Sequence, residues 1–307
     1  MDRGSVLIRP AAREDVPAVA AIVRDENPAW VFSDRGWQHR WESAPARSRL
    51  VALVAVADEK IVGHGGAGLN PSTSVQGAGG LGVTVLDFAR GNGIGSRLYD
   101  ALLEHLKSVG GRNVIAIFVQ NDSGERFART RGFVHVKSAP ISRVDPRTVE
   151  LTIADDPGFR VQPLAALRDR PRDIFDLDAI AALDEPAVNP TDAPRYEDWE
   201  LAEWRHPDLE LNGSSVVLSG DKPVALSLLR VDAERGRGVS AFTATLPEFR
   251  GRGLATRAKA RTLLWAAEHG ITSIATANDD SNLAMLAINR RLGFKPIGTL
   301  VTYQREL

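Results

Sequence analysis

The feature that most constrains this 307-residue chain is a glycine-rich loop that occurs twice. The first copy is Arg90–Gly95 (RGNGIG) and the second is Arg250–Ala255 (RGRGLA); each follows a short apolar run and precedes a helical pattern. A strand that turns through glycines into a helix leaves backbone N–H groups unpaired at the positive end of the helix dipole. The two loops therefore predict two sites for an anionic ligand such as a phosphate.

The spacing of other landmarks indicates that the repetition covers most of the chain. Arg90 and Arg250 are 160 residues apart, and the pairs Gly132-Phe133 and Gly293-Phe294 are 161 residues apart. Such a period predicts two homologous domains, residues 1–150 and 151–307, each long enough to bury its own core. The junction falls between residues 145 and 159, where Asp-Pro and Asp-Pro-Gly sequences are typical of turns.

Each repeat predicts an α+β fold in which helices flank a mixed, twisted sheet. In the first repeat we expect strands at 6–8, 50–57, 61–68, 81–86, 114–119, 134–142 and 148–153, and helices at 11–23, after the loop and at 125–130. In the second we expect strands at 159–164, 214–219, 223–231, 239–246 and 273–277, and helices at 173–183, 196–206, after the loop and at 282–292.

Composition excludes several classes of function. A net charge of −1 disfavours a nucleic-acid or membrane-surface partner, no apolar run is long enough for a spanning helix, and the N-terminus lacks the apolar core of a signal peptide. The chain has no cysteine, and its six histidines show no metal-binding spacing. We therefore expect a cytoplasmic protein that needs no metal and is a monomer or a homodimer.

The loops fit neither common nucleotide-binding motif. A dinucleotide fingerprint needs glycine or alanine where the chain has Ser96 and Thr256, and neither loop ends in the Gly-Lys-Ser/Thr of a P-loop. Both loops instead match R-x-x-G-x-G/A. With this pattern, the chain resembles the GNAT superfamily of N-acetyltransferases, in the tandem arrangement of mycothiol synthase. The run from Thr276 to Asn289 is similar to actinobacterial tandem acetyltransferases.

The resemblance implies an acetyl-CoA site in each half, with the pantetheine arm on the strand before the loop and the pyrophosphate on the loop. The residues that it implies for cofactor binding are Val83, Val85, Arg90, Gly91, Asn92, Gly93, Ile94, Gly95, Ser96 and Asn121 in the first half, and Thr245, Leu246, Arg250, Gly251, Arg252, Gly253, Leu254, Ala255, Thr256, Asn278, Asn282 and Asn289 in the second. Arg97, Arg252, Arg257 and Lys259 are either contacts for the nucleotide phosphates or solvated helix charges.

The chain departs from the family at the tyrosine that often protonates the departing thiolate. Ala128 stands there in the first half and Asn289 in the second. Losing a positioned general acid can lower a rate by roughly 10²–10⁴-fold, although a thiolate is a good leaving group. Asn289 either donates a hydrogen bond to the sulfur or caps a helix turn.

The resemblance implies a base from a carboxylate near the start of the strand before the loop, and residues 75–82 of the first half contain none. Asp232 and Glu234 lie in the predicted hairpin turn before the loop strand, and Asp184 and Glu185 lie in a proline-rich loop; each is otherwise a solvated turn residue. This asymmetry favours the second half as the catalytic one. Two functions stay open: direct acetyl transfer to a small-molecule amine in a ternary complex, or a non-catalytic CoA sensor or scaffold, which the missing tyrosines favour.

Overall fold

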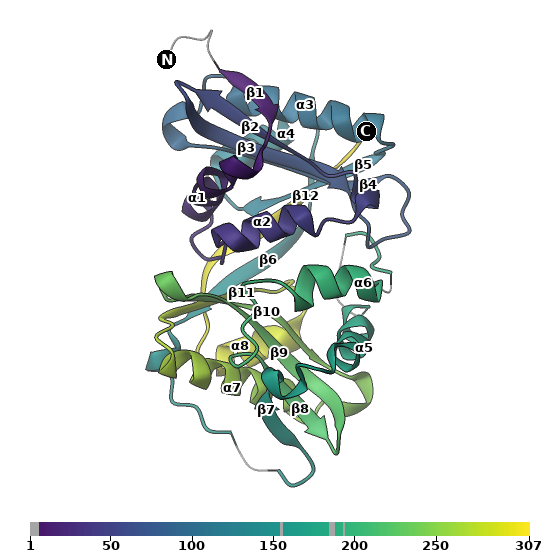
Figure 1. The fold of residues 1–307 in the computed structure, drawn as a ribbon, viewed down its shortest axis with the longest axis vertical. Coiled ribbons are helices and arrows are strands. Elements are labelled where there is room, and N and C mark those ends of the chain that lie inside the picture. Colours follow the sequence, from purple (N-terminus) through teal and green to yellow (C-terminus); the bar gives the residue numbers. More distant parts are fainter. Residues whose placement is uncertain (1–5, 154–155, 184–187, 193) are drawn as a thin grey trace.

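The computed structural model describes residues 6–153, 156–183, 188–192 and 194–307. It confirms the mixed α/β architecture with two similar repeats, which lie one above the other along the long axis (Figure 1). We call residues 1–150 the N-half and residues 151–307 the C-half. Their strands form one twelve-stranded sheet, in the order β1-β2-β3-β4-β5-β12-β6-β11-β10-β9-β8-β7.

The elements of the two halves follow one another in nearly the same order. The N-half contains β1 (Leu7–Pro10), α1 (Val16–Glu26), α2 (Asp34–Glu42), β2 (Val51–Ala57), β3 (Lys60–Leu69), β4 (Ala78–Val85), α3 (Ile94–Ser108), β5 (Asn113–Val119), α4 (Asp122–Arg129) and β6 (Val134–Val144). The C-half contains β7 (Arg160–Pro163), α5 (Pro171–Ala182), α6 (Tyr196–Trp199), β8 (Ser215–Ser219), β9 (Lys222–Asp232), β10 (Arg237–Thr245), α7 (Leu254–Glu268), β11 (Ser273–Ala277), α8 (Leu283–Arg291) and β12 (Lys295–Glu306).

The two halves exchange their last strands. β12 of the C-half pairs with β5 of the N-half, and β6 of the N-half pairs with β11 of the C-half. β6 and β12 also pair with each other, which joins the two sheets. Each half thus completes the other's sheet.

The expectation that residues 148–153 form a closing strand of the N-half is wrong. Residues 146–148 form a short 3₁₀ turn, and Val149, Leu151 and Ile153 pack on the core beneath α7 instead. The position of the missing strand is filled by β12, a strand that the sequence patterns did not predict.

The helices after the two glycine loops form the core in the same way. α3 buries Leu98, Leu102 and Leu106, whose spacing places them on one helix face against the sheet. α7 buries Ala258, Thr262 and Ala266 at the equivalent positions, together with Leu254. Both helices end at a glycine with positive φ, Gly110 at 88° and Gly270 at 74°. Full burial of each leucine contributes about 1.5–3 kcal/mol, so this face fixes the start of each helix, where the glycine loop lies.

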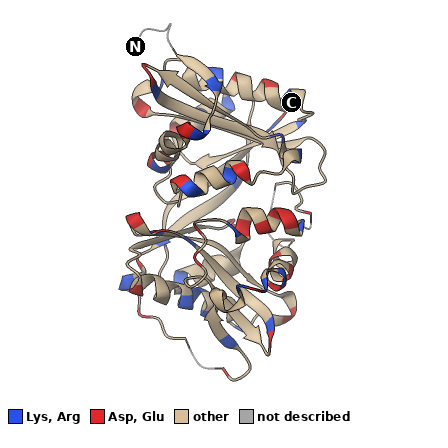
Figure 2. Ribbon diagram, in the orientation of Figure 1, with Lys and Arg blue, Asp and Glu red and all other residues tan. Residues whose placement is uncertain are grey.

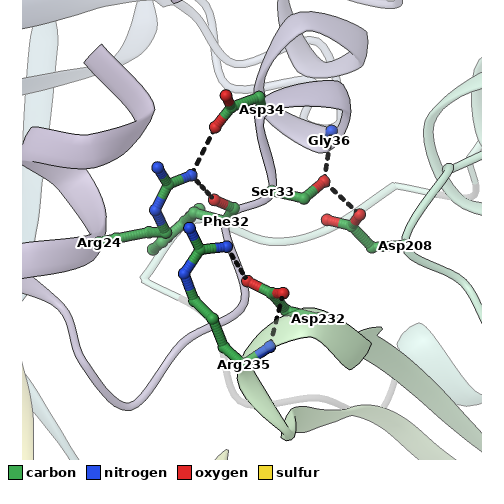
Figure 3. Close-up of polar contacts among 8 residues, drawn as sticks. All are labelled: Arg24, Phe32, Ser33, Asp34, Gly36, Asp208, Asp232 and Arg235. Carbon is green, nitrogen blue, oxygen red and sulfur yellow. Dashed lines mark hydrogen bonds and ion pairs between the residues drawn. The ribbon is translucent and has the colours of Figure 1, made fainter. Parts of the chain in front are cut away.

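The halves also meet through polar contacts beside α2. The hydroxyl of Ser33 donates to the carboxylate of Asp208 at 2.5 Å and accepts from the backbone N–H of Gly36 (Figure 3). Arg47 of the N-half forms an ion pair with Asp198 of α6. Burial raises the pKa of Asp208 above its ordinary value, with the Ser33 hydrogen bond opposing the rise. Residues far apart in the sequence are therefore held together on this side of the sheet.

Candidate functional site

The two glycine loops have the same backbone. Each begins with a 3₁₀ turn, and then two glycines adopt positive φ: 80° and 78° for Gly91 and Gly93, and 75° and 73° for Gly251 and Gly253. Glycine reaches this region without strain, whereas other L-residues do not. Among the described residues, no atom lies within 4 Å of a Cβ built on any of the four. The space above each loop is therefore open to a ligand.

The backbone N–H groups of both loops are available to a ligand. Within the described chain, the N–H groups of residues 91–96 and 251–256 have no backbone or side-chain acceptor. Arg90 Nε donates to the carbonyl of Val85 at 2.8 Å, and Arg250 Nε donates to that of Thr245 at 3.2 Å. Each arginine therefore fastens its loop to the end of the preceding strand. The start of a helix with free N–H groups suits a diphosphate.

The strand before each loop separates from its parallel neighbour. β4 pairs with β5 only from Ala78 to Gly80, although β4 continues to Val85. β10 pairs with β11 only from Arg237 to Val239, although β10 continues to Thr245. Each gap opens toward the carboxyl ends of the strands, where the glycine loop lies. Val83 and Val85 lie on the separated stretch of β4, and Thr245 and Leu246 lie at the end of β10.

β10, the strand that borders the C-half gap, carries buried polar side chains that lack partners. The hydroxyls of Ser240, Thr243 and Thr245 on β10 are buried and have no hydrogen-bond partner in the described structure. An unsatisfied buried polar group costs about 1–3 kcal/mol and is therefore rare without a ligand or a water. β10 also has a β-bulge between Ser240 and Phe242, a device common beside active sites. β4, the counterpart of β10 in the N-half, pairs with β3 without a bulge, and none of its side chains has a buried polar atom without a partner in the described structure.

A buried polar chain runs from α7 to the end of β11. Lys259 Nζ donates to Asn289 Oδ1 at 2.6 Å, and Asn289 Nδ2 donates to Asn278 Oδ1 at 2.7 Å. Lys259 and Asn289 are only 1% and 2% exposed. Burial lowers the pKa of Lys259 to about 7. The two sequence interpretations of Lys259, a phosphate contact or a solvated helix charge, are both wrong, because its side chain points into the core toward α8.

The corresponding positions of the N-half are Tyr99, Ala128 and Phe118. Tyr99 is 3% exposed, and its hydroxyl accepts a hydrogen bond from Arg305 of β12 at 2.6 Å. Phe118 stacks on Tyr303, also from β12. The interior behind the N-half gap is therefore aromatic where the C-half has an amine and two amides.

Two of the predicted asparagines cap helices. Asn121 Oδ1 accepts from the N–H of Gly124 at 2.8 Å, and Asn282 Oδ1 accepts from the N–H of Met285 at 3.1 Å. Such caps stabilise a helix by about 1 kcal/mol. They fix the start of α4 and α8, the helices that carry Ala128 and Asn289. Direct cofactor contact by either asparagine stays a prediction.

The sequence analysis missed Arg131, which lies beside the N-half loop. Its guanidinium donates to Ser96 Oγ at 2.7 Å and lies 3.5 Å from the centre of the Phe127 ring. Its position directly before Gly132-Phe133 was the available signal. In the C-half, Gly253, Thr256 and Arg257 line a cavity of about 330 Å³. Figure 2 shows basic residues along α7, and of these Arg257 lines the cavity beside the loop.

Asp232 and Glu234 lie in the turn between β9 and β10 (Figure 3 shows Asp232). Asp232 is buried and accepts from the N–H and the guanidinium of Arg235, at 3.3 and 3.0 Å, whereas Glu234 is exposed. The turn is at the amino end of β10, about 13 Å along the strand from the bulge. Their role as bases stays a prediction; Asp184 and Glu185 lie outside the described residues.

Other carboxylates lie at the carboxyl end of β11. A cavity of about 360 Å³ is lined by Asp279, Asp280, Lys137 of β6 and Val188, among others. Asp279 forms an ion pair with Lys137 at 2.9 Å. Burial raises the pKa of Asp279, but hydrogen bonds from Ser281 and Lys137 outweigh that effect and hold the pKa below its ordinary value. Asp280 is exposed, and its carboxylate has no partner among the residues that the structure describes. This cavity begins one residue beyond Asn278.

Two further properties concern the described residues alone. No group of three or more His, Asp or Glu side chains in them is arranged to hold a metal ion. None of their helices is both long enough and apolar enough to cross a membrane.

Comparison with known proteins places the chain in a family. The model of the acetyltransferase (GNAT) family matches residues 16–133 and 176–294. A tandem GNAT protein from the clavulanic acid biosynthesis pathway superposes with a TM-score of 0.76 at 16% identity, covering 98% of each chain. A GCN5-related N-acetyltransferase from Sphaerobacter thermophilus superposes with a TM-score of 0.71 at 17% identity, and the match covers 100% of this chain and 96% of that protein.

A putative acetyltransferase from Pyrococcus horikoshii gives a TM-score of 0.63 at 13% identity, covering 99% of this chain and 90% of its own. No curated protein matches the chain. At these identities the solved structures show the fold alone, whereas the family model matches both halves. The chain therefore belongs to the acetyltransferase (GNAT) family, as an acyltransferase with two tandem domains.

Proposed function

We propose that this protein transfers the acetyl group of acetyl-CoA to a small-molecule amine, directly within a ternary complex, and that the C-half carries out the transfer. The observation that carries the proposal is the gap between β10 and β11. Unpartnered buried hydroxyls lie on β10, which borders it, and both the hydrogen bonds from Lys259 through Asn289 to Asn278 and a cavity with carboxylates lie directly after β11.

The residues of the C-half fit the cofactor that the family implies. The N–H groups of residues 251–256, with Arg252 and Arg257, would hold the diphosphate. The separated backbone of β10 and the hydroxyls of Ser240, Thr243 and Thr245 would hold the pantetheine arm, which carries amide donors and acceptors. Acetyl-CoA, when bound, supplies the acetyl group as a reactive thioester.

The cavity at the end of β11 is proposed as the acceptor site. Its carboxylates attract a cationic amine, and Asp280 has an exposed carboxylate that accepts a proton. The bound ammonium first loses one proton to water, because only the neutral amine is a nucleophile. As its nitrogen bonds to the acetyl carbon, the carbon–sulfur bond breaks, its electron pair leaves with the CoA thiolate, and the second proton passes from the nitrogen to Asp280 or to water. We place the base at Asp280 in preference to Asp232 and Glu234, because those two lie at the opposite end of β10.

The N-half is proposed to bind the carrier without transferring its acetyl group. Its loop has the same open cradle, and Arg131 adds a cation beside Ser96. Its gap has Ala128 and Phe118 where the C-half has Asn289 and Asn278. The same features favour the second candidate function, a CoA sensor or scaffold in which both halves only bind. The repeat boundaries at residues 1–150 and 151–307 belong to this proposal, since each unit holds one cradle.

Acceptor-dependent thiol release tests the two candidates. The protein is incubated with acetyl-CoA and a panel of small amines, and free thiol is followed; we expect release with at least one amine. The control is Thr256→Glu, which places a carboxylate in the phosphate cradle while keeping a residue that a helix start favours. Tight CoA binding with no acceptor-dependent thiol across the panel would contradict catalysis and support the sensor.

A further inference from the structure

We infer that Lys259 is a positioning residue: it orients Asn289 and Asn278 so that their amide hydrogens hold the sulfur of CoA in the C-half gap. The inference rests on the proposed function, because it requires the thioester end of the carrier to lie between β10 and β11. It assigns a purpose to a lysine that contacts neither the loop nor the cavity.

The burial of Lys259 requires an explanation. The residue shares its face of α7 with Leu263 and Ala266, which are 1% and 0% exposed, and its ammonium group lies 4.8 Å from the centre of the Phe294 ring. Taking a charged group out of water costs several kcal/mol unless partners compensate. A methionine would fill this space without that cost. A stability argument alone therefore favours an apolar residue, so the lysine points to a use for its donors.

The lysine determines which way the Asn289 amide faces. Lys259 Nζ donates to the oxygen of Asn289, which a lysine does as an ammonium or as a neutral amine, so the nitrogen of Asn289 faces away from it. One hydrogen on that nitrogen goes to Asn278 Oδ1. In the described chain, the second hydrogen has no acceptor, and neither does the amide nitrogen of Asn278. The unused N–H groups therefore belong to Asn289 and to Asn278, the residue directly after β11.

A sulfur atom that gains electron density as its bond to carbon breaks is a suitable acceptor for those groups. N–H donors fixed in advance stabilise negative charge strongly where water is excluded. They also favour a thiolate over a neutral thiol, which only donates or accepts weakly. Hydrogen bonding to the departing sulfur would then take the place of proton donation by a tyrosine. The N-half has Tyr99, Ala128 and Phe118 at the three positions and lacks these amides.

The test compares the binding of CoA with that of desulfo-CoA, in which hydrogen replaces the thiol. All proteins carry Ser96→Glu, which closes the N-half cradle, so that calorimetry at pH 8.5 reports on the C-half alone. The variants are Lys259→Met, Asn289→Asp and, as the matched control in the other half, Tyr99→Phe. Asn289→Asp keeps a partner for Lys259 but turns an N–H donor into an acceptor.

We expect CoA to bind about tenfold more tightly than desulfo-CoA in the background protein and in Tyr99→Phe, the size of one hydrogen bond to a charged group. Lys259→Met and Asn289→Asp should reduce that ratio to near one while leaving desulfo-CoA affinity unchanged. With an acceptor, both variants should lower kcat more than they change KM.

A ratio that is unchanged in both variants would overturn the inference while leaving the proposed function intact. Failure of desulfo-CoA to bind the Ser96→Glu protein would instead place the carrier outside the C-half and contradict both. Thermal unfolding of each variant identifies a misfolded protein, and Asn289→Asp, which preserves the buried contact, then decides the outcome.

Discussion

The two halves have the same phosphate cradle but different interiors behind it. Gly91 and Gly93 match Gly251 and Gly253 in φ within a few degrees, and the following helices start at equivalent residues. Behind the gap, however, the N-half has Tyr99 and Phe118 at the positions where the C-half has Lys259 and Asn278. The cradle is made of backbone, which any sequence with the right glycines reproduces, whereas the reactive end depends on individual side chains. A duplicated domain therefore keeps its capacity to bind more readily than its capacity to react.

The largest expected effect concerns the proposed acceptor cavity. Its carboxylates, Asp279 and Asp280, come from the loop between β11 and α8 of the C-half. Asp280→Asn should lower kcat/KM for the acceptor by about 100-fold or more, because it removes a base and an attraction for a cationic amine. Steady-state kinetics with a saturating concentration of acetyl-CoA measure this. Asp122→Asn, at the first residue of α4 in the N-half, should leave the rate unchanged, and equal losses in the two variants would contradict the assignment.

The second prediction concerns the buried Lys259. The equivalent residue of the N-half, Tyr99, carries no charge. The pKa of Lys259 is about 7 in the folded protein and ordinarily 10.5, so between these values the unfolded chain binds more protons and the stability of the parent rises with pH. Lys259→Met removes this rise. From pH 6.5 to 9.5, the free energy of unfolding of the parent should gain roughly 3 kcal/mol relative to the variant.

Urea unfolding at the two pH values measures this difference. The variant also loses the hydrogen bond to Asn289, a cost that does not depend on pH and therefore cancels in the comparison. Tyr99→Phe should follow the parent throughout. Parallel stability curves for the parent and Lys259→Met would show that the lysine is solvated and would remove the buried chain from the account.

The smallest expected effect sharpens the comparison of the cradles. Gly253→Val and Gly93→Val place the same side chain at the same positive φ, so their costs to stability should be similar, about 1–2 kcal/mol each. Each should weaken CoA binding about tenfold in its own half alone, because the added atoms enter the open space above the loop. Calorimetry that still finds two unaltered sites in Gly253→Val would show that the C-half cradle does not hold the carrier.

Much of the fold was predictable because its signals are local. The glycine loops, the hairpin of β2 and β3 and the periodicity of α3 and α7 all follow from nearby residues. The exchange of β6 and β12 was not predictable. A sequence pattern can indicate a strand, but it does not specify which of two similar sheets that strand joins. Residues 148–153 were assigned to the place that β12 occupies for this reason.

The candidate site divides in the same way. The cradle residues were predictable from the repeated motif, and Asn289 from its departure from the family pattern. The bond from Lys259 to Asn289 joins residues 30 positions apart, and a lone lysine on an amphipathic helix normally indicates a solvated face. Its alignment with Leu263 and Ala266 was the one sign of burial. Asp279 and Asp280 gained their interest only from the cavity that β6 completes.

The most direct test of the central claim, that the C-half transfers the acetyl group, is the rate of acceptor-dependent thiol release by Ser96→Glu and Thr256→Glu measured side by side. Each variant places one carboxylate in one phosphate cradle, where it disfavours a diphosphate; in Ser96→Glu the carboxylate also pairs with Arg131 and takes that cation from the ligand. The account predicts that Ser96→Glu keeps the parental rate and that Thr256→Glu loses it by about 100-fold or more. Loss of the rate in Ser96→Glu, with the parental rate kept in Thr256→Glu, would contradict it.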